Sequence, residues 1–164
     1  METNHDFFSN KFDYKNNVFV LNADDQYADN FGKQWKTYLT TQIDSINDFK
    51  ISEYLLKNIL FNDYNNIKNK NVLEIGSGAG RFTEIILKYA KYCTTVDLSS
   101  SIYYNISKDN RKLTRIKANF FNLKPKKKFD VVICRGVLQH TPKPLDFLYK
   151  LFDFIDTNGS VFFD

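Results

Sequence analysis

Residues 71–83 read NVLEIGSGAGRFT and decide the fold of the chain. A largely apolar run at 72–75 is typical of a buried strand, and it is followed by Gly76, Gly78 and Gly80. Apolar side chains then recur at helical spacing at Phe82, Ile85, Ile86, Tyr89 and Ala90. Because glycine adopts positive φ easily and has no Cβ, such a turn can be tight and a ligand can approach its backbone. The stretch therefore predicts a strand, a glycine turn and a helix, an arrangement that commonly cradles a nucleotide or another cofactor.

The spacing of the glycines narrows the choice of cofactor. A dinucleotide fingerprint would have its third glycine where this chain has Arg81, and the chain lacks the Gly-Lys-Ser/Thr of a P-loop. Instead, Glu74 lies two residues before the first glycine. A carboxylate at this strand end suits a ligand with an ammonium group or hydrogen-bond donors, and it would repel a diphosphate. The spacing therefore argues against a nicotinamide-dependent oxidoreductase.

Composition limits the class of protein. The 164 residues suggest one domain, and 43% hydrophobic residues are enough for a core. No apolar run is long enough to span a membrane, and the N-terminus lacks the apolar core of a signal peptide, so a cytosolic protein is expected. Cys93 and Cys134 lack a CxxC spacing and are predicted to be buried, reduced thiols. With two histidines, no metal site is expected, and a net charge of +4 makes a nucleic-acid partner unlikely.

Strand and helix patterns alternate from Ser52, a favourable helix N-cap, to the end of the chain. Helices are predicted near 52–61, 100–110 and 144–155, and further strands at 92–97, 113–118, 129–134 and 160–164. The connection between the third and fourth strands is too short for the usual crossover helix, so a turn is expected there. The alternation predicts an α/β fold with a parallel sheet and helices on both faces.

Asp97 ends the second of these strands, about twenty residues after the glycines. In nucleotide-binding α/β folds, an acid at this strand end accepts hydrogen bonds from ribose hydroxyls. An acid here could also cap the next helix, although Ser99 can supply that cap alone. We therefore favour the ribose role for Asp97.

Two motifs carry a resemblance to a known family. The pattern E-x-G-x-G-x-G at residues 74–80 resembles the first motif of the class I S-adenosylmethionine-dependent methyltransferases. Residues 129–142, FDVVICRGVLQHTP, resemble the fourth motif region of its small-molecule members. The resemblance covers residues 71–164 and implies a Rossmann-like, doubly wound parallel sheet with strand order 3-2-1-4-5. S-adenosylmethionine would lie across the carboxyl ends of the first and fourth strands.

The resemblance also implies roles for individual residues. The amino acid part of the cofactor would lie over the glycine turn, with the ribose at Asp97 and the adenine at Asn119 and Phe120. The implied cofactor-binding residues are Glu74, Gly76, Ser77, Gly78, Gly80, Asp97, Leu98, Asn119, Phe120, Arg135 and Leu138. Asn119 and Phe120 could equally be a polar loop start and a core aromatic. His140 is the candidate catalytic base, or else a capping or loop-packing residue, and Gln139 stands where the family often has another histidine.

Family members normally carry two more strands after the fifth, and the sequence shows neither. We expect a minimal form of the fold, a shortened chain, or a fold that pairs its exposed fifth strand with a partner. The last alternative would make the protein an oligomer.

Residues 1–50 are predicted to form a helical N-terminal extension ahead of a cofactor-binding domain at residues 51–164. Aromatic and apolar side chains recur every three or four residues at Tyr27, Phe31, Trp35, Tyr38 and Leu39. This helix would either pack on the domain or close over the cleft as a lid, with Gln34 and Trp35 near the substrate.

The sequence therefore predicts an S-adenosylmethionine-dependent methyltransferase that acts on a small molecule. The main alternative is a non-catalytic methyltransferase fold that serves as a scaffold or a partner subunit.

Overall fold

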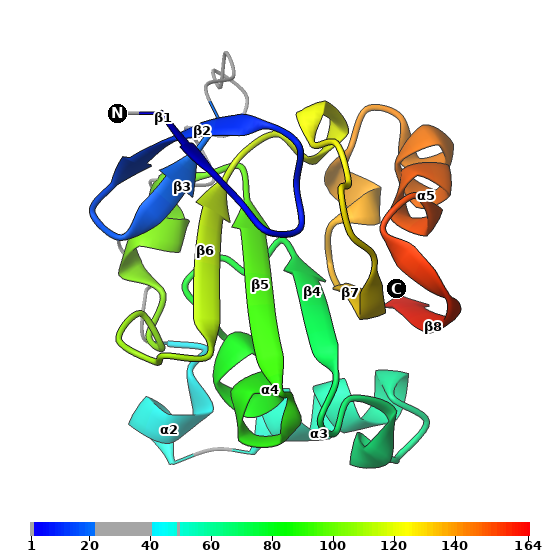
Figure 1. The fold of residues 1–164 in the computed structure, drawn as a ribbon. Helices are drawn as coiled ribbons and strands as arrows, with labels where there is room; N and C mark the ends of the chain where they lie inside the picture. Colours follow the sequence, from blue (N-terminus) through cyan, green and yellow to red (C-terminus); the bar gives the residue numbers. More distant parts are fainter. Residues whose placement is uncertain (1, 22–40, 49) are drawn as a thin grey trace.

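The computed structural model describes residues 2–21, 41–48 and 50–164, and its sheet runs through the centre of the molecule (Figure 1). In this part of the chain, the sheet has eight strands in the order β1-β2-β3-β6-β5-β4-β7-β8. The strands are β1 (Glu2–Asn4), β2 (Lys11–Lys15), β3 (Val18–Val20), β4 (Asn71–Ile75), β5 (Tyr92–Asp97), β6 (Leu113–Lys117), β7 (Phe129–Cys134) and β8 (Ile155–Phe163). Strands β3 to β8 pair in parallel, whereas β1, β2 and β3 pair antiparallel.

The order β6-β5-β4-β7-β8 confirms the predicted order 3-2-1-4-5. Strand β4 pairs with β5 on one side and with β7 on the other, so the direction of winding reverses there. In open α/β sheets, a ligand crevice forms outside the carboxyl ends of the strands at this reversal. The topology therefore places the candidate site above β4.

Helices cover both faces of the sheet (Figure 1). The helices are α2 (Asp44–Asn47), α3 (Ile51–Ile59), α4 (Thr83–Tyr89) and α5 (Pro144–Phe152), and the short 3₁₀ turns are η1 (Tyr64–Asn66), η2 (Ser100–Tyr104), η3 (Phe120–Asn122) and η4 (Leu138–His140). Alternate residues of β4 point to opposite faces. Val72 packs with α3 and α4, whereas Leu73 and Ile75 pack with α5. The doubly wound arrangement is thus confirmed.

The prediction of a helical N-terminal extension is wrong for residues 2–20, which contain the strands β1 to β3. Strand β3 pairs with β6 and so extends the sheet. The guanidinium of Arg115 on β6 donates to the Asn17 carbonyl, which ties the β2–β3 turn to the sheet. The predicted helix with Gln34 and Trp35 lies outside the described residues, and the division at residue 50 stays a prediction.

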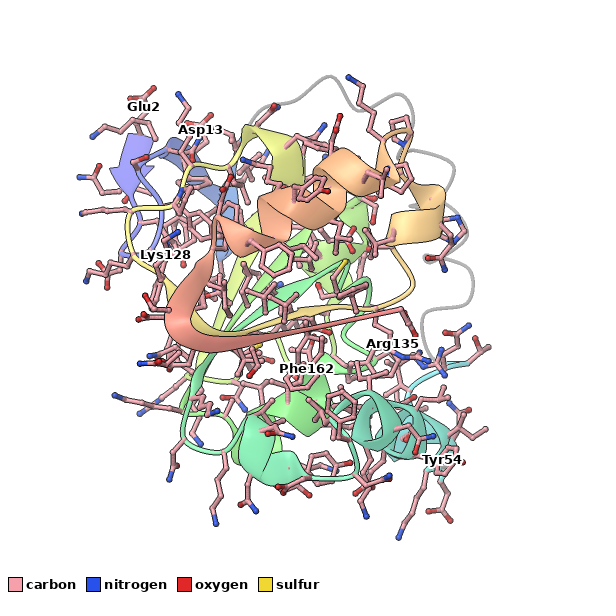
Figure 2. All side chains as sticks on the ribbon, turned by 90° about the vertical axis from the view of Figure 1, so that its right-hand side faces the viewer. Glu2, Asp13, Tyr54, Lys128, Arg135 and Phe162 are labelled. Carbon is pink, nitrogen blue, oxygen red and sulfur yellow. The ribbon has the colours of Figure 1, made fainter. Side chains whose placement is uncertain are left out.

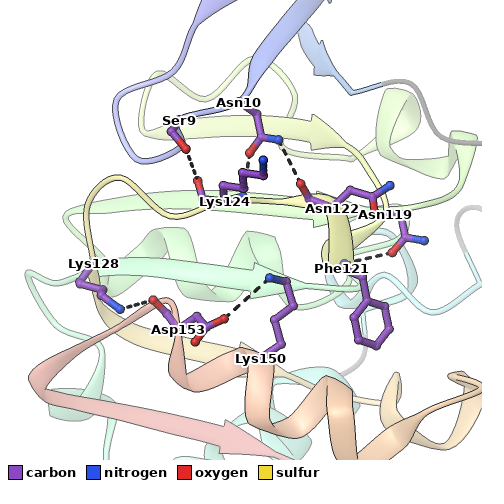
Figure 3. Close-up of polar contacts among 9 residues, drawn as sticks. All are labelled: Ser9, Asn10, Asn119, Phe121, Asn122, Lys124, Lys128, Lys150 and Asp153. Atoms are coloured by element: carbon purple, nitrogen blue, oxygen red, sulfur yellow. Dashed lines mark hydrogen bonds and ion pairs between the residues drawn. The ribbon is translucent and has the colours of Figure 1, made fainter.

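The N-terminal segment also fills a gap in the core. Only η3 lies in the connection between β6 and β7, as the sequence predicted, so no long helix shields that part of the sheet. Phe8 and Phe12 are fully buried there, and Phe7 stacks on Phe129 with ring centroids 4.3 Å apart. Figure 3 shows how Asn10 fixes the segment, because its side chain accepts from the Lys124 backbone N–H and donates to the loop.

Two further elements differ from the sequence prediction. The helix expected at 100–110 is only the turn η2, and Ile106 is 43% exposed. Strand β8 starts at Ile155, earlier than the strand predicted from residue 160, so Asn158 and Gly159 lie within it. A Cβ at Gly159 would lie 2.9 Å from the Asp130 carbonyl, so its lack of a side chain lets β8 run close to β7.

The described residues contain no helix long and apolar enough to cross a membrane. Nor do they contain a group of three or more His, Cys, Asp or Glu side chains placed to hold a metal ion.

Candidate cofactor-binding cleft

A cleft of about 450 Å³ lies at the carboxyl ends of β4, β5, β6 and β7. Each strand contributes the segment that follows its last residue, so the cleft is built from four loops on a rigid sheet. The lining includes residues 75–78 after β4, 96–99 after β5, 118–121 after β6 and 135–137 after β7. This position matches the one that the strand order predicts.

Most of the predicted site residues meet in this cleft. Its lining includes Gly76, Ser77, Gly78, Asp97, Leu98, Asn119, Phe120, Arg135 and His140. Glu74, Gly80 and Leu138 are not among the lining residues, and Gln34 and Trp35 lie outside the described residues. The sequence therefore predicted the position of the cleft better than it predicted the residues beneath its surface.

The glycine turn has a backbone that only glycine adopts easily. Gly76 and Gly78 have φ of 76° and 52°, in the left-handed region. A Cβ at Gly76 would lie 2.1 Å from Cγ2 of Val137, in the loop after β7. Gly76 thus lets the loop after β4 and the loop after β7 lie close together at the base of the cleft.

Asp97 joins the end of β5 to the glycine turn. Its Oδ2 accepts the Gly78 N–H at 2.7 Å, and its Oδ1 accepts the Ser99 N–H at 2.8 Å and the Ser99 hydroxyl at 2.6 Å. Burial raises the pKa of the Asp97 carboxyl, and these hydrogen bonds oppose that shift. Ser99 caps η2 by accepting from the Ser101 N–H, so Asp97 is not needed as that cap.

Glu74 lies beneath the glycine turn, and it points to the same face of β4 as Val72, where α3 and α4 pack. It is 3% exposed, and its Oε2 accepts the Thr83 hydroxyl at 2.6 Å. The Asn105 amide in turn donates to Thr83 Oγ1, and a Cβ at Gly80 would lie 2.5 Å from Asn105 Oδ1. Burial raises the pKa of Glu74 to about 8. Glu74 and Gly80 therefore brace the start of α4 in this structure.

The adenine end predicted from the sequence is made of one polar and one core residue. Asn119 caps η3, because its Oδ1 accepts the Phe121 N–H at 3.0 Å (Figure 3). Phe120 is buried, and its ring centroid lies 4.8 Å from that of Phe154 and 5.0 Å from that of Phe147. Asn119 and Phe120 also line the cleft, so the structure shows the loop-start and core roles, and contact with an adenine stays a prediction.

The sequence analysis missed Arg81, which entered it only as the residue that rules out a dinucleotide fingerprint. Arg81 lines the cleft with Gln42 and Phe82. Its Nε donates to Ser52 Oγ at 2.9 Å, and its Nη1 donates to Gln42 Oε1 at 2.8 Å. A basic residue directly after the last glycine is the signal that could have identified it.

Arg135 and His140 come from the segment after β7. Arg135 lies on the side of the molecule that Figure 2 faces, with its Nε 3.0 Å from Oδ2 of Asp164. The same carboxylate accepts the Gly136 N–H at 2.7 Å and so fixes the loop. His140 ends η4 and is exposed at the cleft beside Thr141 and Pro142.

The fold and this cleft define a Rossmann-like methyltransferase fold. Residues 48–164 match the sequence profile of the methyltransferase domain family, so the chain belongs to that family and carries a class I S-adenosylmethionine-dependent methyltransferase domain.

Known proteins share this domain at low sequence identity. Over 103 residues the chain is 27% identical to a ubiquinone biosynthesis O-methyltransferase of Coxiella burnetii, which covers 59% of this chain and 44% of the relative. An enzyme of the same name from Pasteurella multocida is 26% identical over 88% of this chain and 65% of its own. Among solved structures, the N-methyltransferase NodS from Bradyrhizobium japonicum, in complex with S-adenosyl-L-homocysteine, has a TM-score of 0.65 at 18% identity. That match covers 82% of this chain and 72% of NodS. The chain thus spans less than half the length of the Coxiella relative.

Proposed function

We propose that this chain binds S-adenosylmethionine in the cleft and transfers its methyl group to a small-molecule acceptor. The observation that carries the proposal is the meeting of three features at one place: the glycine turn, the Asp97 carboxylate and a buried hydroxyl. Ser77 lines the cleft and is 5% exposed, and among the described residues its buried hydroxyl has no hydrogen-bond partner. A buried polar group of this kind is costly unless a ligand pairs with it. The residues present therefore fit a polar cofactor.

The lining suggests how the cofactor would be held. Gly76, Ser77 and Gly78 would face its amino acid part, Asp97 with Leu98 its ribose, and Asn119 with Phe120 its adenine. When bound, S-adenosylmethionine supplies a methyl group that its positive sulfur has already activated. The protein then has mainly to position the acceptor and exclude water. No metal ion is needed for this role of the protein.

His140 is the side chain we propose as general base. It is exposed at the cleft, in the segment that follows β7, so an acceptor entering from solvent would reach it. A base within hydrogen-bond reach of an acceptor hydroxyl would take its proton as the new bond to the methyl carbon forms. The two ubiquinone biosynthesis enzymes named above are O-methyltransferases, which supports an acceptor with a hydroxyl group, whereas the structural neighbour NodS is an N-methyltransferase.

The test is calorimetric titration with S-adenosylhomocysteine and with NAD, followed by turnover of labelled S-adenosylmethionine. We expect one site for S-adenosylhomocysteine, none for NAD, and transfer of label to at least one compound in a panel of small hydroxylated acceptors. Binding without transfer to any acceptor would favour the alternative of a non-catalytic scaffold or partner subunit. Absence of binding would contradict the proposal.

We also propose that β8 pairs with a second copy of the chain. In the described part of the chain, β8 is at the edge of the sheet; its Phe163 is exposed, and α5, which packs against it, carries exposed apolar side chains at Leu145 and Tyr149. An edge with exposed apolar neighbours favours strand pairing between chains. Sedimentation equilibrium should show a dimer, and a monomer at the highest soluble concentration would contradict this proposal.

A further inference from the structure

A second cavity, of about 260 Å³, lies where the N-terminal segment meets the sheet. The N-terminal segment contributes residues 4–7 and Phe19 to its lining, and the sheet contributes Tyr92 and Thr114. Tyr92 begins β5 and Thr114 is the second residue of β6, so this cavity lies toward the amino ends of these strands. The cleft lies at their carboxyl ends and shares no lining residue with it. The cavity is therefore separate from the proposed cofactor site.

The walls of this cavity are aromatic, and contacts outside the cavity hold them in place. The Phe7 ring stacks on Phe129 with centroids 4.3 Å apart, and the Phe7 carbonyl accepts the Lys126 N–H at 2.8 Å. The rings of His5 and Phe19 meet edge to face, with centroids 4.9 Å apart. Because these rings are fixed before any ligand arrives, their faces and edges favour a ligand that is itself an aromatic ring.

His5 is the buried polar group of the cavity. It is 7% exposed, and burial lowers the pKa of its imidazole to about 4 against the opposing charge of Asp6. The ring is thus uncharged near neutral pH. Its Nδ1 accepts the Phe7 backbone N–H at 3.1 Å, so the proton of the neutral imidazole is on Nε2. Within the part of the chain that the structure describes, this Nε2–H has no acceptor, and it is left for a molecule in the cavity.

A pair of hydroxyl groups forms the second polar point. The Tyr92 and Thr114 hydroxyl oxygens lie 2.7 Å apart, and one hydroxyl donates to the other. This bond uses only one of the two hydroxyl protons, so the pair keeps one donor and free acceptor lone pairs. The cavity can therefore donate to a ligand carbonyl and accept from a ligand N–H.

The charges around the cavity are balanced. Asp6 and Asn4 are its exposed lining residues, and the Lys11 ammonium donates to the Asn4 side-chain oxygen at 2.6 Å. The rim thus carries one negative and one positive charge, while the imidazole within is uncharged. An ionised ligand would find no unpaired opposite charge here, and burying an unpaired charge is costly. An uncharged ligand is favoured.

We infer that this cavity is a second ligand site, which binds an uncharged molecule with one aromatic ring and a carbonyl or carboxamide substituent. The ring would lie against Phe7 and Phe19, with the substituent between His5 and the hydroxyl pair. Small-molecule pockets usually have roughly 300–1,000 Å³, so a cavity of about 260 Å³ suits a single substituted ring rather than a molecule as large as S-adenosylmethionine. The site goes beyond the proposed function and does not rest on it.

The experiment titrates the protein with benzamide and follows the imidazole signals by NMR. The chain has two histidines, His5 and His140, so the signals of His5 are those that disappear in His5→Phe. Should His5→Phe fail to fold, His140→Gln identifies the same signals by elimination. Benzoate, which has the shape of benzamide and a charge, and toluene, which has the ring and no polar group, are the comparison ligands.

Benzamide should shift the His5 signals saturably at millimolar concentrations and leave those of His140, which lines the cleft, in place. Benzoate and toluene should bind at least about threefold more weakly, because one brings an unpaired charge and the other leaves the polar groups unpaired. Absence of a saturable shift of His5, or equal binding of the three ligands, would overturn the inference.

The double variant Tyr92→Phe/Thr114→Val tests the hydroxyl pair. It removes both partners of one hydrogen bond, a change that costs little stability. The control is Tyr64→Phe, because the Tyr64 hydroxyl donates to the Glu53 carbonyl at 3.1 Å on the other face of the sheet. We expect the double variant to weaken benzamide binding about two- to tenfold, with the control within about twofold of wild type. Wild-type affinity in the double variant, checked for folding by thermal melting, would count against the site.

Discussion

Replacing Asp97 by alanine removes the carboxylate that joins the end of β5 to the glycine turn. In the free protein, this carboxylate accepts three hydrogen bonds: one from Gly78 and two from Ser99. Even at the net value of a neutral hydrogen bond, roughly 0.5–1.5 kcal/mol each, three bonds amount to roughly 1.5–4.5 kcal/mol, so Asp97→Ala should lower the free energy of unfolding by about that much or more. The variant should therefore be less stable whatever the function of the cleft.

The loss of cofactor affinity in Asp97→Ala depends on the acceptor position that the protein leaves free on this carboxylate. A carboxylate offers about four acceptor positions, of which the protein uses three, so about one remains for a ribose hydroxyl. A hydrogen bond to a charged group is worth roughly 1.5–3 kcal/mol, which corresponds to a loss of affinity of about 10- to 150-fold. We expect Asp97→Ala to raise the Kd for S-adenosylhomocysteine by a factor in this range.

The assay is calorimetric titration at a temperature well below the melting point of every variant, with Asp130→Ala as the control. The Asp130 carboxylate accepts from the Asn71 backbone N–H at 2.7 Å and from the Asn71 side chain at 3.2 Å. These bonds lie at the amino end of β4, opposite the cleft. Asp130→Ala should thus lose stability without losing affinity.

A change of ligand distinguishes the loss of a direct contact between Asp97 and the ribose from a distortion of the glycine turn. The 2′-deoxy analogue of S-adenosylhomocysteine should bind more weakly than the parent compound in wild type, but about equally well in Asp97→Ala, because the two deletions remove one interaction. If Asp97→Ala loses stability like the control yet keeps the wild-type Kd, Asp97 only anchors the turn and the reasoning fails.

Three further predictions concern the turn, the acid below it and the candidate base. Gly76→Ala should lower the free energy of unfolding, measured by chemical denaturation, by at least about 2 kcal/mol, because the new Cβ would clash with Val137 and the residue has a positive φ. The double variant Gly76→Ala/Val137→Ala should recover part of this loss. No recovery would contradict the clash. Folding raises the pKa of Glu74 from 4.5 to about 8, so the folded state keeps a proton that the unfolded chain releases above about pH 4.5. Stability should therefore fall as the pH rises from about 4.5 through 8, and Glu74→Gln should flatten that decline in denaturation curves while leaving the Kd for S-adenosylhomocysteine within about threefold; an unchanged pH profile would refute the assignment. His140→Gln should lower kcat at least about tenfold with little change in that Kd, and unchanged turnover would make His140 a loop residue.

Much of the fold could be predicted because short patterns determine it. The strand at 72–75 with its glycine turn and the strand at 129–134 are apolar runs whose character does not depend on distant residues. Together they located the point where the strand order reverses, and hence the cleft. The ends of these two strands, together with those of β5 and β6, supply most of its lining.

The N-terminal strands could not be predicted for a physical reason. Phe8 and Phe12 are buried because the connection from β6 to β7 leaves space on the sheet, and the segment that fills this space lies more than a hundred residues away. Their spacing follows the shape of that space and not the period of a helix or strand. Likewise, η2 ends at Tyr104, where Asn105 leaves the helical conformation and its side chain accepts the Ser107 N–H and donates to Thr83.

The site residues that could be predicted also differ in their surroundings from those that could not. Most residues that line the cleft lie at or just after strand ends, and the sequence identified them. Arg81 also lines the cleft, but it is held by Ser52 and Gln42, which are 29 and 39 residues away, and no single motif reports these contacts.

Hydrogen exchange with and without S-adenosylhomocysteine tests the central claim most directly. We predict slower amide exchange centred on residues 75–78, 96–99, 118–121 and 135–137, because these four segments line the cleft. A second, smaller cavity of about 260 Å³ beside His5, Phe19 and Thr114 serves as an internal control and should be unaffected. Protection centred on that cavity, or no protection at saturating ligand, would contradict the assignment of the cleft as the S-adenosylmethionine site.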